Sequence, residues 1–397
     1  DLSSRFHPDH RGGYFPSVSA AWRISEETFM RRTRSWLDNL KFRLSYGTLG
    51  NQYTSSLYPY MATIEPTTSI MPIGGSITSA MRQNSASNRY ITWETIKMTN
   101  LGLDMGLFNN KLNMSFDYFI KDTDDILLRV ELPGVLGVTE PYQNAGKVRN
   151  KGWELALSWK DKIGKNFTYG VDFNLSDVKN EVVSMGNTAD DFSGDQIRAV
   201  GYPIDAFWGF QADGLYTVDD FDYDVNTGKY TPKKSTPVIE ELRTKVQPGD
   251  IKYRDLDGDG EITTKDDRTY IGSAIPRYTY SLGVNAAWKG IDLKVFLQGV
   301  GKCDGYVGGM GRHAFTEVAN YPQKVHLDRW TWDNQNSHAT YPRFTYDETY
   351  NKKFSSFWIE DASYLRVKNI QLGYTFPAQK INFLSKLRIS NLRVYFS

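Results

Sequence analysis

The stretch Leu112–Lys121, which reads LNMSFDYFIK, decides the fold class of this chain. Apolar side chains occupy every second position, and the apolar set is Leu112, Met114, Phe116, Tyr118 and Ile120. The residues between them are mainly polar, and Phe119 is the exception. A period of two residues is typical of a β-strand with one apolar face and one hydrated face.

The same alternation recurs over most of the chain. It predicts about ten strands, at residues 14–24, 38–48, 96–107, 111–122, 147–160, 167–179, 277–289, 291–302, 362–376 and 387–397. Charged residues fall in the middle of these strands on the polar face, and they include Lys41, Arg43, Asp104, Asp117, Glu154 and Asp172. Such a face needs water, which either the outside of a soluble β-sandwich or the lumen of a membrane barrel supplies.

The lengths of the connections favour the barrel. Four of them are short, at 109–110, 162–166, 289–290 and 377–386, and they alternate with four long ones, at 49–95, 123–146, 180–276 and 303–361. Transmembrane barrels combine short periplasmic turns with long extracellular loops, whereas a sandwich has no reason to lengthen every second connection. We therefore predict an all-β, antiparallel, up-and-down transmembrane barrel with long extracellular loops, and a soluble glycan-binding sandwich is the alternative.

Composition narrows the functional classes. With 47 basic and 46 acidic residues, the net charge of +1 gives no long-range attraction for nucleic acid. No run of 18 apolar residues exists, so helical membrane spans are not expected. The lone Cys303 excludes an internal disulfide framework. Asp1 is not a start methionine, and Leu392–Ser397 reads as an interrupted strand, so we expect a segment of a longer protein.

One loop has the spacing of a calcium site. Within 255–266, the carboxylates Asp255, Asp257 and Asp259 stand at positions one, three and five of an EF-hand-like loop, and Gly260 at position six permits a sharp turn. Glu261 would offer its backbone carbonyl, and Asp266 stands at position twelve, where Glu is usual. We predict a structural calcium ion held by Asp255, Asp257, Asp259, Glu261 and Asp266; the alternative is an acidic turn without metal.

The chain lacks the motifs of common enzymes. There is no Gly-x-Ser-x-Gly elbow, no His-Glu-x-x-His helix and no phosphate-binding glycine loop. His7 and His10 could ligate a metal, but a solvated loop is the simpler interpretation. We therefore predict that the protein is not an enzyme, with an outer-membrane hydrolase as the alternative.

Several stretches resemble the SusC/RagA group of TonB-dependent outer-membrane transporters. They are 3–6 (SSRF), 13–25 (GYFPSVSAAWRIS), 40–51 (LKFRLSYGTLGN), 93–95 (WET), 100–104 (NLGLD), 142–146 (YQNAG), 150–155 (NKGWEL), 248–253 (PGDIKY) and 361–369 (DASYLRVKN). The resemblance implies a barrel of about 22 strands of which residues 1–397 are the C-terminal portion. It also implies an N-terminal plug and a TonB contact that lie outside this chain, and a SusD-like lipoprotein lid.

The resemblance further implies active import of nutrient oligomers across the bacterial outer membrane, with membrane lipid around the barrel. Glycans are the expected cargo because aromatic rings stack on sugar rings and the long loops are rich in them. The candidate cargo-binding residues are Trp208, Tyr216, Tyr306 and Trp330, although loop packing or contact with the lid would also explain each of them. A peptide importer of the same type and a passive porin are the alternatives.

Overall fold

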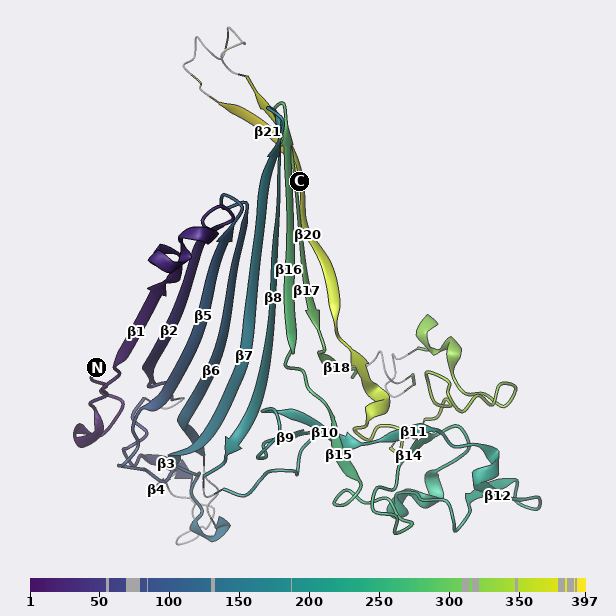
Figure 1. The fold of residues 1–397 in the computed structure, drawn as a ribbon. Coiled ribbons are helices and arrows are strands. Elements are labelled where there is room, and N and C mark those ends of the chain that lie inside the picture. The colour runs from purple at the N-terminus through teal and green to yellow at the C-terminus, as the bar shows by residue number, and fades with distance from the viewer. Residues whose placement is uncertain are drawn as a thin grey trace.

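A computed structural model of the chain describes residues 1–54, 57–68, 79–83, 85–129, 133–186, 188–308, 314–315, 321–346, 349–377, 383, 389 and 391–397. Within these residues, ten strands form one antiparallel sheet, and each strand pairs with the next one of the set in chain order (Figure 1). The strands are β1 (Ser17–Arg23), β2 (Leu37–Asn51), β5 (Glu94–Leu107), β6 (Leu112–Arg129), β7 (Tyr142–Ile163), β8 (Phe167–Ser184), β16 (Tyr278–Trp288), β17 (Ile291–Gly301), β20 (Tyr364–Phe376) and β21 (Leu392–Phe396). This order confirms the up-and-down prediction, and the sandwich alternative is wrong.

The predicted strands lie in the observed positions, but three of them are too short. Strands β6, β7 and β8 continue several residues past their predicted ends on the side of the long loops. The added part of β6 carries charged side chains, which obscure the apolar alternation, but ion pairs hold the neighbouring strands together there. Asp124 on β6 lies 2.8 Å from Lys97 on β5 and 2.9 Å from Lys147 on β7. Part of the predicted strand 387–397 lies outside the described residues, and β21 occupies its last part.

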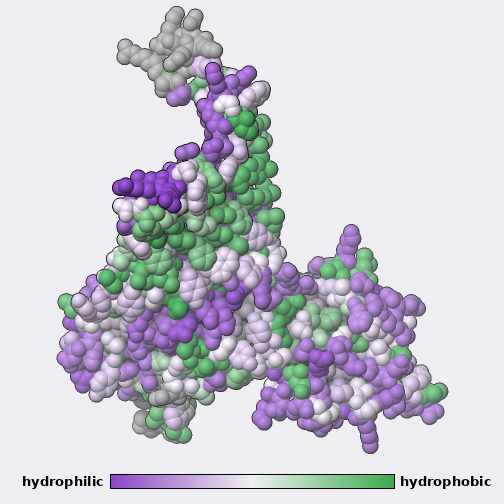
Figure 2. Space-filling model, in the orientation of Figure 1, coloured by the Kyte–Doolittle hydropathy of each residue, from purple (hydrophilic) through white to green (hydrophobic). Residues whose placement is uncertain are grey.

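The two faces of the sheet differ as the alternation requires. Across β2, β5, β6 and β7 the register aligns Leu44, Leu101, Tyr118 and Trp153 on one face. Large apolar side chains on this face are exposed, for example Leu44 at 44% and Leu101 at 40%. Figure 2 shows them as a green band across the strands with hydrophilic surface at both ends. The charged residues predicted for the other face share the opposite parity in the same register.

Short turns close one end of the sheet and long segments the other (Figure 1). Lys289 and Gly290 join β16 to β17 with φ values of 49° and 92°, the left-handed pair that a two-residue hairpin turn requires. At the other end, β3 (Ile64–Thr68) and β4 (Ser79–Gln83) form a hairpin between β2 and β5. Because transmembrane barrels keep their long loops outside the cell, the predicted barrel would have its extracellular side at this end.

The remaining short elements lie mainly in the two longest connections. The strands are β9 (Gln196–Ile197), β10 (Ala206–Phe210), β11 (Ala212–Leu215), β12 (Phe221–Asp224), β13 (Lys229–Pro232), β14 (Ile251–Tyr253), β15 (Arg268–Gly272), β18 (Asp304–Tyr306) and β19 (Ile359–Asp361). The 3-10 helices are η1 (Pro8–His10), η2 (Ile24–Glu26), η3 (Thr28–Thr33), η4 (Gly134–Leu136), η5 (Val218–Asp220), η6 (Glu240–Lys245), η8 (Lys324–Asp328) and η9 (Ser356–Trp358). No helix in the described part of the chain is long and apolar enough to cross a membrane.

Candidate functional site

Two long segments fold together into one unit beside the end of the sheet that carries the long loops. We call the described residues of 188–276 and 304–361 the loop domain; it lies at the lower right of Figure 1. Its buried core draws on both segments, including Tyr216 and Ile251 from the first and Trp330 and Trp358 from the second. Neither segment could bury these side chains alone, so the two connections form a single packed domain.

Asp250 joins the two segments from inside this core. Its side chain is 1% exposed, and its Oδ1 accepts a hydrogen bond from Asn351 Nδ2 at 2.9 Å. Arg343 Nη2 donates to Oδ2 at 3.2 Å, and Arg343 Nε lies 2.8 Å from Oδ1. Burial raises the pKa of the Asp250 carboxyl, and the Arg343 charge acts in the opposite direction. A buried charge with this many partners fixes the relative position of the two segments.

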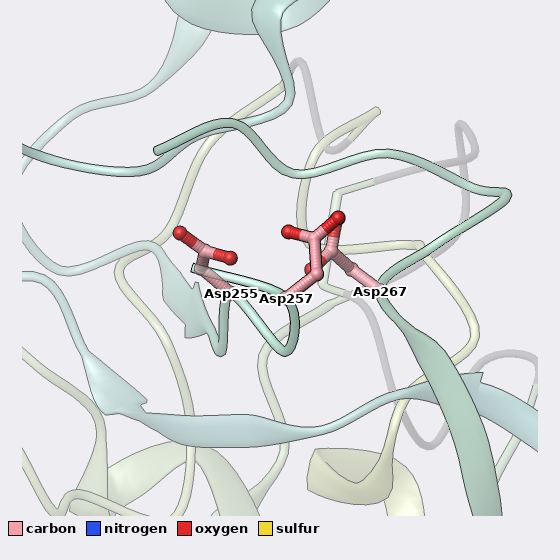
Figure 3. Close-up of side chains that lie close together, drawn as sticks. All are labelled: Asp255, Asp257 and Asp267. Atoms are coloured by element: carbon pink, nitrogen blue, oxygen red, sulfur yellow. The ribbon is translucent and has the colours of Figure 1, made fainter. Parts of the chain in front are cut away.

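The acidic loop follows directly in sequence, after β14. Within the described residues, carboxylate oxygens of Asp255, Asp257 and Asp267 lie within 4.8 Å of one another (Figure 3). Gly258 and Gly260 take φ values of 80° and 93°, which the tight turn requires. Both glycines donate backbone hydrogen bonds to Asp255, at 2.6 and 2.9 Å. The sequence therefore bends here so that three acidic side chains converge.

The electrostatics of this cluster favour a cation. The backbone N–H groups of Gly260 and then Gly258 hold the pKa of Asp255 below its usual value. For Asp257, the Asp259 N–H favours the ionised form, but desolvation and the charges of Asp259 and Asp267 outweigh it and raise the pKa. Such mutual repulsion disfavours three ionised groups at one point, and a hard divalent cation would relieve it.

Other predicted ligands take different places. Asp267, at position thirteen, is fully buried and accepts hydrogen bonds from Leu256 N and Thr263 N, both at 2.7 Å. Asp266 instead contacts the Thr263 hydroxyl at 3.4 Å, and Asp259 accepts from Glu261 N at 2.9 Å. Asp267 lies with Asp255 and Asp257, because those two backbone donors turn its side chain inward. The doublet itself was the signal that two positions could close the loop.

The predicted cargo-binding aromatics divide into two pairs. Tyr216 is 0% exposed, and its hydroxyl donates to Pro237 O at 2.7 Å, while Trp330 is 2% exposed. Both rings pack in the core of the loop domain, so in this conformation neither face can stack on a cargo. Trp208 and Tyr306 are half-buried, with Trp208 packed on Phe192 and Tyr306 on Phe354. Of the four predicted residues, only this second pair has ring surface open to solvent.

The polar face of the sheet carries a network of ion pairs. Arg43 on β2 donates to Asp104 on β5 at 2.9 Å through both Nε and Nη2, and Nη2 also reaches Asp117 on β6 at 2.9 Å. It crosses the intervening strand above Gly102, where a Cβ atom would lie 2.5 Å from the guanidinium carbon. Ser115 donates to Asp104 at 2.9 Å. The network gives the face fixed charges instead of an apolar surface.

These features agree with one family over the length of the chain. A family model described as "TonB dependent receptor-like, beta-barrel" matches residues 2–396. The chain belongs to this family. TonB-dependent receptor P3 of Formosa agariphila is 30% identical over 409 residues, which cover 100% of this chain and 38% of that protein. TonB-dependent receptor SusC of Bacteroides thetaiotaomicron is 26% identical, with coverages of 95% and 35%.

Solved structures show the same fold. The RagAB peptide importer in its "open-open" state gives a TM-score of 0.76 at 24% identity and covers 99% of this chain and 39% of the other. The RagAB peptide transporter gives 0.73 at 24% identity, with coverages of 99% and 40%. This chain therefore spans about two fifths of these proteins or less.

As a TonB-dependent receptor of the SusC/RagA type, the chain is a segment of an outer-membrane β-barrel. Its apolar face lies toward lipid, and the face with Arg43, Asp104 and Asp117 lies toward the lumen. The family is one of transport receptors and not of enzymes. The predicted membership, fold, location and absence of enzymatic activity are thus confirmed.

Proposed function

We propose that the full-length protein imports nutrient oligomers across the outer membrane with energy supplied through TonB. The observation that carries this proposal is the match of the ten-stranded sheet to TonB-dependent receptor barrels over residues 2–396. The ionic lumen face supports a hydrated passage, since fixed charges such as Arg43 and Asp117 require water or polar partners. TonB would engage a region outside this chain.

A SusD-like surface lipoprotein is the proposed partner, acting as a lid over the extracellular mouth. The chain is similar to SusC and to the RagAB peptide importer. Structures of that importer are described in "open-open" and "closed-closed" states, which supports a partner that opens and closes. The loop domain offers a folded surface at the end of the sheet that carries the long loops (Figure 1). Its outer residues, such as Tyr223 and Trp332, are exposed.

We propose oligosaccharides as the cargo. Trp208 and Tyr306 keep partly open rings in the loop domain, and Trp332, which packs on Tyr230, is 55% exposed. Exposed aromatic faces are the groups that stack on sugar rings. The structural likeness to the RagAB peptide importer supports the alternative of a peptide cargo.

The deciding experiment uses the full-length transporter, purified with and without its lid protein. Calorimetric titration with an oligosaccharide panel and an oligopeptide panel should show saccharide binding that strengthens when the lid is present. Tight binding of peptides with no response to saccharides would establish the peptide alternative. Uptake that continues after deletion of TonB would instead support the passive porin and refute active import.

We also propose that the acidic loop binds a structural calcium ion through Asp255, Asp257 and Asp267, with Asp259, Glu261 and Asp266 as the further candidates from the spacing. The three converging carboxylates are the hard oxygen donors that calcium prefers. The ion would hold the turn closed against charge repulsion, and Ile262, 2% exposed, would stay anchored in the loop-domain core.

Calcium binding predicts a stabilised loop. At a hundredfold excess over its Kd, calcium should stabilise the loop domain by about 2.7 kcal/mol and slow proteolysis within 185–277. Asp257→Ala should abolish this effect, whereas Glu241→Ala, a charge removed from η6 in the same segment, should preserve it. Equal cleavage rates with calcium and with chelator in the wild type would refute the proposal.

A further inference from the structure

On the lipid-facing surface of the sheet, apolar side chains give way to charged side chains near the extracellular end. The strand register arranges this face in rows. One row holds Leu44, Leu101, Tyr118, Trp153 and Asp177, the next holds Tyr46, Thr99, Ile120, Lys151 and Lys179, and the third holds Thr48, Lys97, Asp122, Arg149 and Glu181. Aromatic rings thus give way to charged side chains within two rows. Hydrophilic surface follows the green band at this end in Figure 2.

The order of these rows indicates the level at which the charged side chains lie relative to the membrane. Tyr and Trp side chains collect at the boundary between hydrocarbon and headgroups. Tyr46, Tyr118 and Trp153 form this boundary here. The charged side chains one and two rows farther out therefore lie at the level of the outer-leaflet headgroups, and they point outward because they share the parity of the lipid-facing residues.

The charges at this level are unbalanced. The outward band contains five cationic side chains, Lys97, Lys147, Arg149, Lys151 and Lys179, and three anionic ones, Asp122, Asp124 and Glu181, for a net charge of +2. Asp122 and Asp124 are engaged with Lys97, Lys147 and Arg149 at 2.7 to 3.2 Å. These three cations and two carboxylates leave one excess positive charge, and the remaining two lysines with Glu181 leave the other.

Lys151 on β7 and Lys179 on β8 stand directly opposite each other in the register. Like charges in such a cross-strand pair repel each other. Glu181 is the carboxylate beside them, and its Oε2 lies 3.0 Å from Lys179 Nζ. Both lysine side chains are exposed. One carboxylate for two cations leaves the pair suited to a further anion from outside the protein.

A cavity of about 340 Å³ adjoins this pair. Lys179 lines it together with Arg277, Lys302, Tyr202 and Tyr270. Arg277 donates to Asp177 at 3.0 Å, so its charge is compensated within the protein. Lys302 adds a cation and Asp304 a carboxylate to the lining, and the two tyrosine rings lie 6.1 Å apart. The lining therefore holds more cationic than anionic side chains, together with ring surface.

We propose that Lys151 and Lys179, with Lys302 in the adjoining cavity, bind the phosphate group of an anionic outer-leaflet lipid. Charge complementarity and continuity with the lipid-facing band support this occupant. Lys151 and Lys179 lie on the lipid-facing side of the sheet, so their contact with a headgroup is separate from the passage and independent of the cargo. A bound headgroup would fix the barrel in its annular lipid beside the base of the loop domain.

The test is native mass spectrometry of the full-length transporter with phosphorylated lipid A as the probe. Each lysine near a charged surface contributes roughly a factor of five in binding. Lys151→Gln with Lys179→Gln should therefore weaken lipid retention about 25-fold. The double Lys→Arg variant should retain the lipid, which separates loss of charge from misfolding. Lys229→Gln with Lys234→Gln, in the loop domain away from the sheet, is the matched control and should bind like the wild type.

Two further measurements distinguish lipid from other anions. Lipid A without its phosphates should bind the wild type as weakly as phosphorylated lipid A binds the double glutamine variant. Millimolar inorganic phosphate should leave the bound lipid in place. Equal retention by wild type and the glutamine variant, equal retention of the two lipids, or full displacement by inorganic phosphate would each overturn the proposal.

Discussion

The carboxylate of Asp250 is buried in the core of the loop domain, and neighbouring side chains compensate its charge and satisfy its hydrogen bonds. Arg343 supplies the opposite charge at 2.8 Å, and Asn351 supplies a neutral donor at 2.9 Å. Asn351 Oδ1 also accepts from Ile251 N at 2.9 Å, so one amide side chain serves both the charge and the backbone of β14. Residues about a hundred positions apart thereby form one hydrogen-bonded group.

Arg343→Met should destabilise the loop domain by about 3–5 kcal/mol, because it leaves the Asp250 carboxylate buried without a cation. Thermal unfolding of the purified transporter, followed by proteolysis of the loop domain, measures the loss. Arg198→Met removes the exposed Arg198–Asp205 pair and should cost less than about 1 kcal/mol. Similar losses in both variants would contradict the buried-charge argument.

Asp220 makes the stability of the loop domain depend on acid pH. Burial raises its pKa, but hydrogen bonds from Lys252 and from Thr217 outweigh burial and hold the pKa below its usual value. A depressed folded-state pKa gives stability that is present above the ordinary value of 3.8 and is lost as pH falls through the folded value. Asp220→Asn should reduce the loss of unfolding free energy on acidification below pH 4. An identical acid profile in the variant would show that Asp220 contributes nothing.

The strands of the sheet have two faces with opposite requirements, and β8 shows both within two residues. Phe173 belongs to the lipid-facing row with Leu157 and Leu282, while Asn174 lies on the lumen face and donates to Ser281 Oγ at 3.1 Å. The strand itself is equally well paired at both positions. The solvent on each side of the wall therefore decides which substitutions it tolerates.

Phe173→Arg should destabilise the folded barrel by about 2–4 kcal/mol, since it places a charge in hydrocarbon near mid-membrane. Asn174→Arg adds the same side chain to the hydrated lumen and should cost less than half as much. Equilibrium unfolding in lipid vesicles compares the two variants. A larger loss for Asn174→Arg would mean that the two faces are assigned the wrong way round.

Across the molecule, the extracellular unit depends on contacts between two connections that are distant in sequence. The backbone of Leu215 donates to Ser337 O at 2.9 Å, and the Tyr253 hydroxyl donates to Tyr350 O at 2.9 Å. Trp358 is 3% exposed within the shared core. Loosening either segment should therefore loosen the other.

Trp358→Ala should cost about 3–5 kcal/mol through the cavity it leaves, and the damage should appear in the first segment as well. Hydrogen exchange at the amides of Leu215 and Ile251 reports that segment directly. Trp332→Ala removes a ring that is 55% exposed and should leave both amides protected. Unchanged protection in Trp358→Ala would show that the segments fold independently.

The sequence determined the sheet, because a period of two is a local property that each strand carries without its neighbours. Strand positions, the long and short connections and the residues on each face all followed from it. The ends of β6, β7 and β8 did not. The charged Asp124 in the added part of β6, for example, is held in the ladder by Lys97 and Lys147 on the neighbouring strands, and such pairing is not visible in the sequence of one strand. The convergence of Asp255 and Asp257 was predictable from spacing, but the inward turn of Asp267 was not.

Only the tertiary structure decided which aromatic rings of the long loops are buried and which are exposed. Tyr216 and Trp330 are aromatic loop residues, as Trp208 is. Tyr216 and Trp330 are nevertheless buried, whereas Trp208 is half-buried. The sequence does not distinguish an aromatic residue that binds cargo from one that packs against another ring. Its exposure depends on which distant segment packs against it, and that pairing exists only once both connections have folded together.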